Sequence, residues 1–170
     1  MQLTMSKTRE QFPLSYKKIW KKTITGIFGW IPFSVFLVVL GIYFARWGES
    51  DAARWLVTSG IFFGLLSCLL TYFFQRWYFA TYFYNFTPDF IIIRKGPITP
   101  HEITIPYERI QDVYVDQDFY DRLFGMYDVH VSSATVSSDM EAHIDGLEKN
   151  AAEGLRAQLL EAVRSRVSKK

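Results

Sequence analysis

The chain has 170 residues, of which 49% are hydrophobic and 18% aromatic, and its 19 Lys and Arg side chains nearly balance 17 Asp and Glu. Two long apolar runs leave room for only one small domain, which excludes a large α/β enzyme. The single cysteine, Cys68, excludes an internal disulfide and any multi-cysteine metal cluster.

The near balance of charge hides a strong asymmetry along the chain. Residues 1–22 carry six basic side chains and one acidic one, whereas residues 75–148 carry five basic and twelve acidic ones. Residues 149–170 are again basic, with six basic side chains and two acidic ones. Nucleic acid is a poor ligand for such an acidic body, because affinity for the phosphate backbone needs clustered basic residues.

The two apolar runs, residues 23–45 and 55–75, contain no charged side chain and no histidine. A helix needs about 20 residues to cross the hydrocarbon core of a bilayer. The sequence therefore predicts a two-span transmembrane hairpin over residues 23–75. The absence of ionisable groups argues against a proton relay, an ion pathway or a transporter of charged substrates.

The basic segment at residues 1–22 predicts the orientation. Basic residues are retained on the cytoplasmic side, so both termini are expected in the cytoplasm of an inner-membrane protein. Phe12, Tyr16, Ile19 and Trp20 predict a short amphipathic segment lying at the headgroup level. Four lysines are the candidate contacts to lipid headgroups: Lys17, Lys18, Lys21 and Lys22.

Two features inside the predicted spans concern helix geometry. Pro32 predicts a bend in the first span. Gly60 and Gly64 form a G-x-x-x-G pattern, which allows close helix packing. They are expected to pack either against the first span of the same chain or against a second copy of the chain.

Residues 76–170 read as a small mainly β domain. An aromatic run at 77–86 predicts a strand, the beginning of which either is strand or extends the preceding helix. Further strands are expected at 90–94, 102–106, 110–115, 126–133 and 140–144, with a short helix or turn at 120–124. A final helix over 148–167 has an apolar stripe formed by Ala152, Leu155, Leu159 and Val163. A small barrel closed by one helix is the predicted architecture.

Two stretches carry a family resemblance: residues 105–113, Ile-Pro-Tyr-Glu-Arg-Ile-Gln-Asp-Val, and residues 122–125, Arg-Leu-Phe-Gly. With the preceding hairpin, the chain resembles, over roughly residues 20–165, the membrane-flanked bacterial pleckstrin-homology-like domain family of the YdbS-like type. The resemblance implies a pleckstrin-homology-like barrel with a C-terminal capping helix on the cytoplasmic face, and no catalytic residues. It also implies a larger multi-repeat paralogue as a partner, in tolerance of antimicrobial compounds.

Catalytic and metal chemistry find little support in the residues. The chain has no nucleophile elbow, phosphate-binding loop or zinc-protease motif, so neither an enzyme nor a cofactor is expected. His101, His130 and His143 are expected at the surface; the last two would share a metal only if their strands were neighbours and a further ligand joined them. The acidic run from Asp112 lacks the spacing of a calcium-binding loop.

Two surfaces are the candidate partner-binding sites. Asp112, Asp116 and Asp118 are predicted to dock a basic segment, either residues 17–22 of this chain or part of another protein. Tyr82 and Tyr84, on the aromatic strand, form the second candidate surface.

The function expected from these features is a membrane-anchored adaptor, with residues 1–22 as a juxtamembrane segment, 23–75 as the hairpin and 76–170 as the cytoplasmic domain. The main alternative is an anionic-lipid-sensing module that uses the four lysines with Arg94 and Lys95. An accessory subunit of an exporter, or an enzyme with unrecognised chemistry, is the third. Salt separates the first two, because screening weakens headgroup attraction more than an apolar interface.

Overall fold

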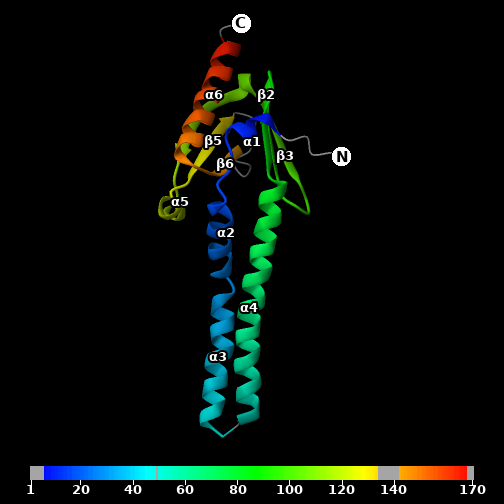
Figure 1. Ribbon diagram of the computed structural model, residues 1–170, viewed down its shortest axis with the longest axis vertical. Coiled ribbons are helices and arrows are strands. Elements are labelled where there is room, and N and C mark those ends of the chain that lie inside the picture. The colour runs from blue at the N-terminus through cyan, green and yellow to red at the C-terminus, as the bar shows by residue number, and fades with distance from the viewer. Residues whose placement is uncertain (1–5, 49, 134–141, 168–170) are drawn as a thin grey trace. The chain divides into compact units, whose positions relative to one another are not determined.

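The computed structural model describes residues 6–48, 50–133 and 142–167, and its chain divides into two compact units. The β unit comprises Met1–Lys18 and Tyr78–Lys170, and the helical unit comprises Ile19–Trp77 (Figure 1). The helical unit is therefore inserted between two parts of the β unit in the sequence.

The helical unit contains α2 (Lys17–Ile27) from Ile19 onward, α3 (Ile31–Arg46), and α4 (Ser50–Thr81) as far as Trp77. Within the described residues, α4 alone is long and apolar enough to cross a membrane, and only 6% of its most apolar window is buried. Helices α2 and α3 pass the same test together, but they are bent by 46° at the break between them. Pro32 stands in the first turn of α3, where its missing amide costs no helical hydrogen bond, so the bend falls just before it.

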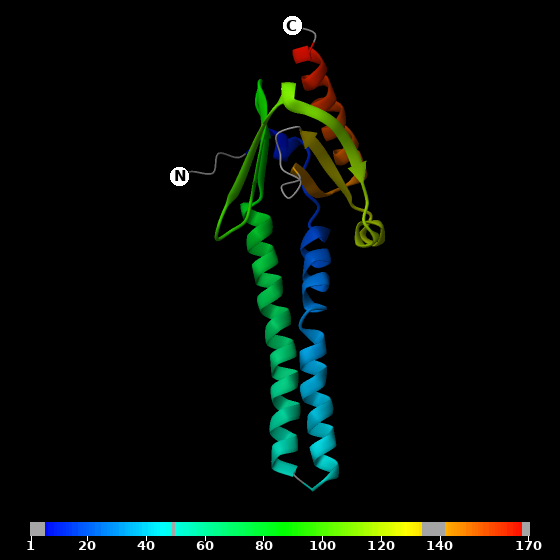
Figure 2. The same ribbon diagram turned by 180° about the vertical axis from the view of Figure 1, so that it is seen from behind.

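The β unit contains two three-stranded antiparallel sheets. The first has the order β1 (Phe83–Phe86), β2 (Phe90–Lys95) and β3 (His101–Pro106). The second has the order β4 (Ile110–Asp116), β5 (Tyr127–Ser133) and β6 (Ala142–Leu147), and a short 3-10 turn, η1 (Tyr107–Arg109), joins the two sheets. Figure 2 shows β4 in yellow-green as a long, curved strand that leads to α5.

The core of the β unit follows the alternation predicted from the sequence. Val113 in β4 and Val129 and Val131 in β5 are buried, as expected for the inward face. The terminal helix α6 (Lys149–Val167) packs against β4, β5 and η1, and its Ala152, Leu155 and Leu159 are fully buried. Burial of this stripe is the apolar contact that holds α6 on the second sheet.

Residues 6–12 cover the outer edge of β1. The short helix α1 (Lys7–Gln11) begins after Ser6, whose hydroxyl donates to the Tyr84 carbonyl. Thr8 Oγ1 accepts the main-chain amide of Phe86 at 3.0 Å. Side chains thus satisfy main-chain groups that an edge strand would otherwise present to water.

The segment then crosses to the end of the second sheet. Ser15 donates its amide to the Gly146 carbonyl at 2.8 Å, and Leu14 forms an isolated antiparallel bridge with Leu147 of β6. The sequence predicts that residues 1–22 form a separate juxtamembrane segment, amphipathic and lying at the headgroup level. In the structure, residues 6–18 are part of the β unit, which corrects that assignment, because their polar side chains find main-chain partners within its sheets.

Two element boundaries are fixed by the structure. Of the two alternatives for the beginning of the aromatic run at 77–86, strand or an extension of the preceding helix, the structure has the second, because α4 continues through Thr81 and β1 begins at Phe83. Consecutive aromatic residues suit both a membrane-interface helix and a strand, so their composition does not fix the boundary. Of the strand expected at 140–144, Met140 lies outside the described residues, and β6 extends to Leu147.

Candidate interaction surfaces

Strand β4 is an outer strand, and no other described strand pairs with its free edge. Asp112, Tyr114 and Asp116 are exposed along it, while Val113 between them is buried. Each carboxylate accepts the next main-chain amide, at 2.8 Å for Asp112 and 2.7 Å for Asp116, which holds it close to the strand. Asp112 and Asp116 are called the acidic edge below.

Asp118, the third predicted docking residue, stabilises the start of a helix. It caps α5 (Phe119–Phe124): its Oδ1 accepts the Asp121 amide at 2.6 Å, while Asp121 bonds back to the Asp118 amide. Such a reciprocal capping box stabilises a short helix. Gly125 ends α5 with a φ of 67°, a left-handed conformation that favours glycine. Asp118 is exposed, but its carboxylate is committed to this cap.

Tyr82 and Tyr84 do not form a partner surface, which corrects the sequence-based prediction. Both side chains are fully buried: Tyr84 points inward from β1, and Tyr82, two residues earlier and just before that strand, points to the same side. The Tyr82 hydroxyl donates to the His143 carbonyl at 3.1 Å, and the Tyr84 hydroxyl donates to the Phe12 carbonyl. Burial raises the pKa of both phenols, that of Tyr82 strongly, with nearby Asp145 adding to the effect.

The prediction that Lys18 contacts lipid headgroups is also wrong, because only 3% of this residue is exposed. Its Nζ lies 2.9 Å from Asp145 Oδ1 and 3.0 Å from the Asp145 carbonyl. The ammonium also stands 3.8 Å from the centroid of the Tyr82 ring, a cation–π arrangement. A basic residue of the 17–22 segment does contact an acidic group of the domain, but that group is Asp145 and not Asp112, Asp116 or Asp118.

The remaining candidate lysines differ in exposure. Lys21 is buried, whereas Lys22 and Lys17 are exposed. Lys17 donates from Nζ to the Phe124 carbonyl at 3.3 Å, at the end of α5. Of the four lysines, therefore, only Lys17 and Lys22 are exposed enough to contact a lipid headgroup.

Three rings form a ladder across the second sheet. Tyr114 pairs with His130, and His130 pairs with His143, in the strand register. The Tyr114 and His130 ring centroids are 4.9 Å apart with an interplanar angle of 2°, and those of His130 and His143 are 5.4 Å apart at 22°. An imidazole binds a metal in its own ring plane, so two stacked rings do not direct their lone pairs at one ion. Within the described residues, no group of three or more potential ligands is close enough to hold a metal.

Gly60 and Gly64 lie against α3 of the same chain. Ser34 donates from its hydroxyl to the Gly60 carbonyl at 2.8 Å. A Cβ atom at Gly60 would lie 2.9 Å from Val38 Cγ2, and one at Gly64 would lie 2.8 Å from Ser34 Oγ. The glycines therefore permit a close approach of α3 and α4, which is the intrachain alternative of the sequence analysis.

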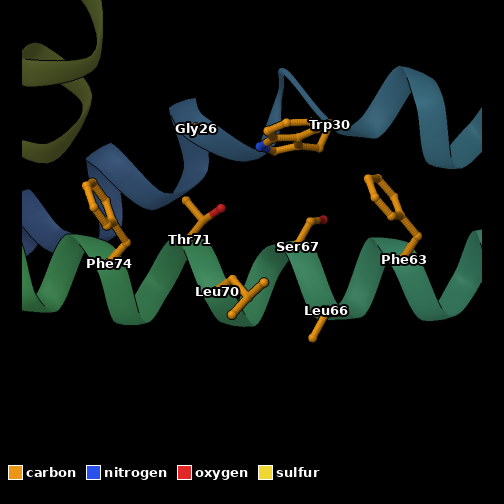
Figure 3. A pocket seen from close by; sticks show the side chains of 8 residues that line it. All are labelled: Gly26, Trp30, Phe63, Leu66, Ser67, Leu70, Thr71 and Phe74. Atoms are coloured by element: carbon orange, nitrogen blue, oxygen red, sulfur yellow. The ribbon is translucent and has the colours of Figure 1, made fainter.

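A groove of about 460 Å³ runs along α4 beside the break between α2 and α3 (Figure 3). Figure 3 shows the Trp30 ring across from α4, with Thr71 and Ser67 projecting toward the facing helices and Phe63 and Phe74 at either end. No charged side chain lines it, so it suits an apolar group. The lining residues are Gly26, Trp30, Phe63, Leu66, Ser67, Leu70, Thr71 and Phe74.

A family model described as Bacterial PH domain matches residues 24–163. The chain belongs to the bacterial PH domain family. No curated protein and no solved structure gives a significant match.

Membership fits the observed architecture of this bacterial PH domain, since two antiparallel three-stranded sheets with a C-terminal helix are consistent with a PH-like fold. PH-like domains are in general interaction modules without catalytic activity. The match also covers α3, α4 and the C-terminal end of α2.

Sequence reasoning missed two contributors to the PH domain, Asp145 and Arg9. Asp145 stands next to the apolar Ile144 on β6, and a carboxylate at such a position signals a buried partner. Arg9 donates to the carbonyl of Tyr82 and, at 3.0 Å, to that of Phe79. No local pattern predicts these bonds, because they join residues more than 60 positions apart.

Proposed function

We propose that this bacterial PH domain is a membrane-anchored cytoplasmic adaptor, which holds a basic extended segment of another membrane protein along the acidic edge. The acidic edge is the observation that carries the proposal. A free edge strand binds an extended peptide through main-chain hydrogen bonds, and the exposed carboxylates of Asp112 and Asp116 favour Lys or Arg in that peptide. The same charges discourage pairing of two acidic copies through β4.

The anchor is proposed as a two-span hairpin of the membrane-flanked, YdbS-like type. The length and low burial of α4 support one span, and the bent pair α2 and α3 supplies the other if it is counted as one. The excess of basic residues before the first span favours a cytoplasmic β unit. A transmembrane partner, such as the larger multi-repeat paralogue expected from the resemblance, would meet the β unit on that side.

We propose a non-enzymatic role, because buried polar side chains make structural contacts instead of lining an open site. Two buried charged side chains make structural contacts: Lys18 pairs with Asp145, and Asp121 bonds Asp118 in a helix cap. The largest buried tyrosines donate to main-chain carbonyls rather than toward an open site.

Site-directed photo-crosslinking in the native membrane tests the adaptor. A photoreactive phenylalanine analogue at Tyr114 keeps an aromatic ring on the acidic edge, and the same analogue at exposed Ala157 of α6 is the matched control. We expect one protein adduct from position 114, absent from position 157 and lost in the double variant Asp112→Lys, Asp116→Lys. Asp118 is left intact because its substitution would also disturb α5.

Salt decides between the adaptor and the lipid-sensing alternative. A stoichiometric protein that stays with the extracted chain in high salt supports the adaptor. Recovery of the chain with only anionic lipid that washes away in salt would instead support headgroup sensing. Arg94 is already paired with Glu102 at 2.8 Å, which weakens the basic surface that headgroup sensing needs.

A further inference from the structure

We infer that the β unit rests on the bilayer through an apolar rim, made of Phe119 and Leu123 on α5 and Ile98 in the β2–β3 turn. These three side chains would enter the headgroup region of the membrane that holds the apolar helices. The inference rests on the membrane anchoring of the proposed function, and it is independent of the acidic edge and its partner.

The three rim side chains are large and apolar, yet they lie outside the core and are mostly exposed. Phe119 is 79% exposed, Leu123 72% and Ile98 70%. Phe119 and Leu123 are four residues apart, so they share one face of α5. The capping box and Gly125 fix both ends of this helix, and the two side chains are therefore presented outward by a defined structure rather than by a loose loop.

Helix α5 is bonded to a residue that lies close in sequence to the first apolar run. Lys17 Nζ bonds the Phe124 carbonyl at 3.3 Å, which ties the end of α5 to the start of α2. The first apolar run begins six residues later, at Thr23. Six helical residues span about 9 Å, and amphipathic elements bury their apolar faces ~5–10 Å into the headgroup boundary. The tether therefore keeps α5 within reach of the interface.

The β2–β3 turn lies at the end of the first sheet where the chain arrives from α4. Phe83, the first residue of β1, pairs with Arg94 near the end of β2, and Ile98 follows four residues after Arg94. Gly96 has a φ of 100°, which fixes the tight turn there. Figures 1 and 2 both show α5 and this turn at one end of the β unit.

A lipid surface fits this rim better than a peptide does. The apolar residues come from two separate elements at one end of the unit, the helix α5 and the β2–β3 turn. Cations flank the α5 site, since Arg122 and Lys17 are exposed, but so do the carboxylates of Asp116 and Asp118. With charges of both signs present, apolar insertion supplies the affinity, and contact is expected on neutral as well as anionic lipid.

Depth-dependent quenching in liposomes tests the rim with the full chain. In a Cys68→Ser background, single cysteines at Arg122 and at Thr99 carry an environment-sensitive dye and leave the rim residues in place. Phosphatidylcholine brominated close to the headgroup is the quencher for the dyes on the β unit, and phosphatidylcholine brominated near the ends of its acyl chains is the quencher for the anchor. A dye at Leu69 of α4 reports the anchor, and one at Ser165 reports the other end of the β unit, since the adjacent Arg166 bonds the Pro88 carbonyl in the β1–β2 turn.

We expect blue-shifted, quenched emission at 122 and 99, in high salt as well as low, and none at 165. The variants Phe119→Ser with Leu123→Ser should abolish quenching at 122, and Ile98→Ser should abolish it at 99. Dyes at 122 and 99 that behave like the dye at 165, while the dye at 69 is quenched deep in the bilayer, would overturn the rim and leave the anchor standing. An unquenched dye at 69 would overturn the rim together with the anchor.

Discussion

At the scale of single residues, the ion pair of Lys18 and Asp145 connects the N-terminal segment to β6. Lys18→Met removes the cation that lies 2.9 Å from a carboxylate whose side chain is only 10% exposed. Removing one partner of a buried pair costs about 3–5 kcal/mol. We expect a clear fall in the thermal unfolding midpoint of the detergent-solubilised protein, followed by near-UV circular dichroism.

The neighbouring Lys17→Met is the matched control for that prediction, because Lys17 is exposed and a surface substitution changes stability by about 0.5 kcal/mol or less. A Lys18→Met protein as stable as the Lys17→Met protein would show that the pair is replaceable. The double variant Lys18→Met, Asp145→Leu should recover part of the loss, since no charge is then left in the buried site.

The buried tyrosines predict how stability changes in alkali. Burial raises the pKa of Tyr107 to about 12, an effect that nearby Arg166 reduces and Asp89 increases, and burial also raises the pKa of Tyr84. Folding therefore favours the neutral phenols. Their contribution is complete below pH ~10, where an unfolded tyrosine titrates, and is lost as the pH rises toward their folded-state pKa values.

We expect the unfolding midpoint to fall steeply above pH ~10, with phenolate absorbance appearing as the protein unfolds. Tyr107→Phe should flatten this fall while lowering stability at neutral pH by about 1 kcal/mol, because its hydroxyl donates to the Thr87 carbonyl at 2.8 Å. Tyr16→Phe, at a position that is 76% exposed, is the control for the loss of one tyrosine. An unchanged slope in Tyr107→Phe would contradict the assignment.

At the scale of elements, α6 and the N-terminal segment meet at Gly154. A Cβ atom there would lie 2.5 Å from Phe12 Cε1. Alanine favours a helix over glycine by about 1 kcal/mol, whereas forcing an extra methyl group into a packed contact costs about 1–3 kcal/mol. Gly154→Ala should therefore destabilise the protein and speed tryptic cleavage at Lys7 and Arg9.

The sign of that effect should reverse when Phe12 is shortened. In a Phe12→Ala background the ring is absent, so Gly154→Ala should stabilise by about 1 kcal/mol through helix propensity alone. Stability and cleavage measured over the four proteins give the coupling between the two elements. Additive effects of the two substitutions would mean that residues 6–18 do not pack on α6 as described.

The elements that the sequence predicts well are those whose pattern is local. Alternating Val113, Val129 and Val131 located β4 and β5, and the stripe of Ala152, Leu155 and Leu159 located α6. The contacts of residues 6–18 were missed because they join the chain's beginning to strands 70 to 130 residues away. The role of Tyr82 and Tyr84 was mispredicted because the composition of the aromatic run suits both a surface contact and a core, and only the tertiary packing, which buries both side chains, shows that they belong to the core.

At the scale of the whole molecule, the order of the units along the chain has a consequence for folding. The β unit needs both residues 6–18 and residues 78–170, and the helical unit stands between them in the sequence. The N-terminal segment therefore cannot complete its contacts until the last strands have been made. The two ends of the chain are held together by packing inside the β unit as well as by the helices that connect them.

Cutting the connection between α3 and α4 tests this arrangement and the proposed topology together. A protease site inserted after Gly48, where a φ of 85° and open surroundings indicate an accommodating turn, should be cleaved from the outer face of sealed membranes and protected in inverted vesicles. After cleavage, the N-terminal fragment should still co-purify with the remainder in mild detergent. Co-purification should weaken in Phe12→Ala with Lys18→Met, which removes two contacts of the segment, and not in Lys17→Met. Fragments that separate at once from the wild-type sequence would contradict the joined β unit, whereas cleavage only in inverted vesicles would contradict the orientation and leave the joined unit intact.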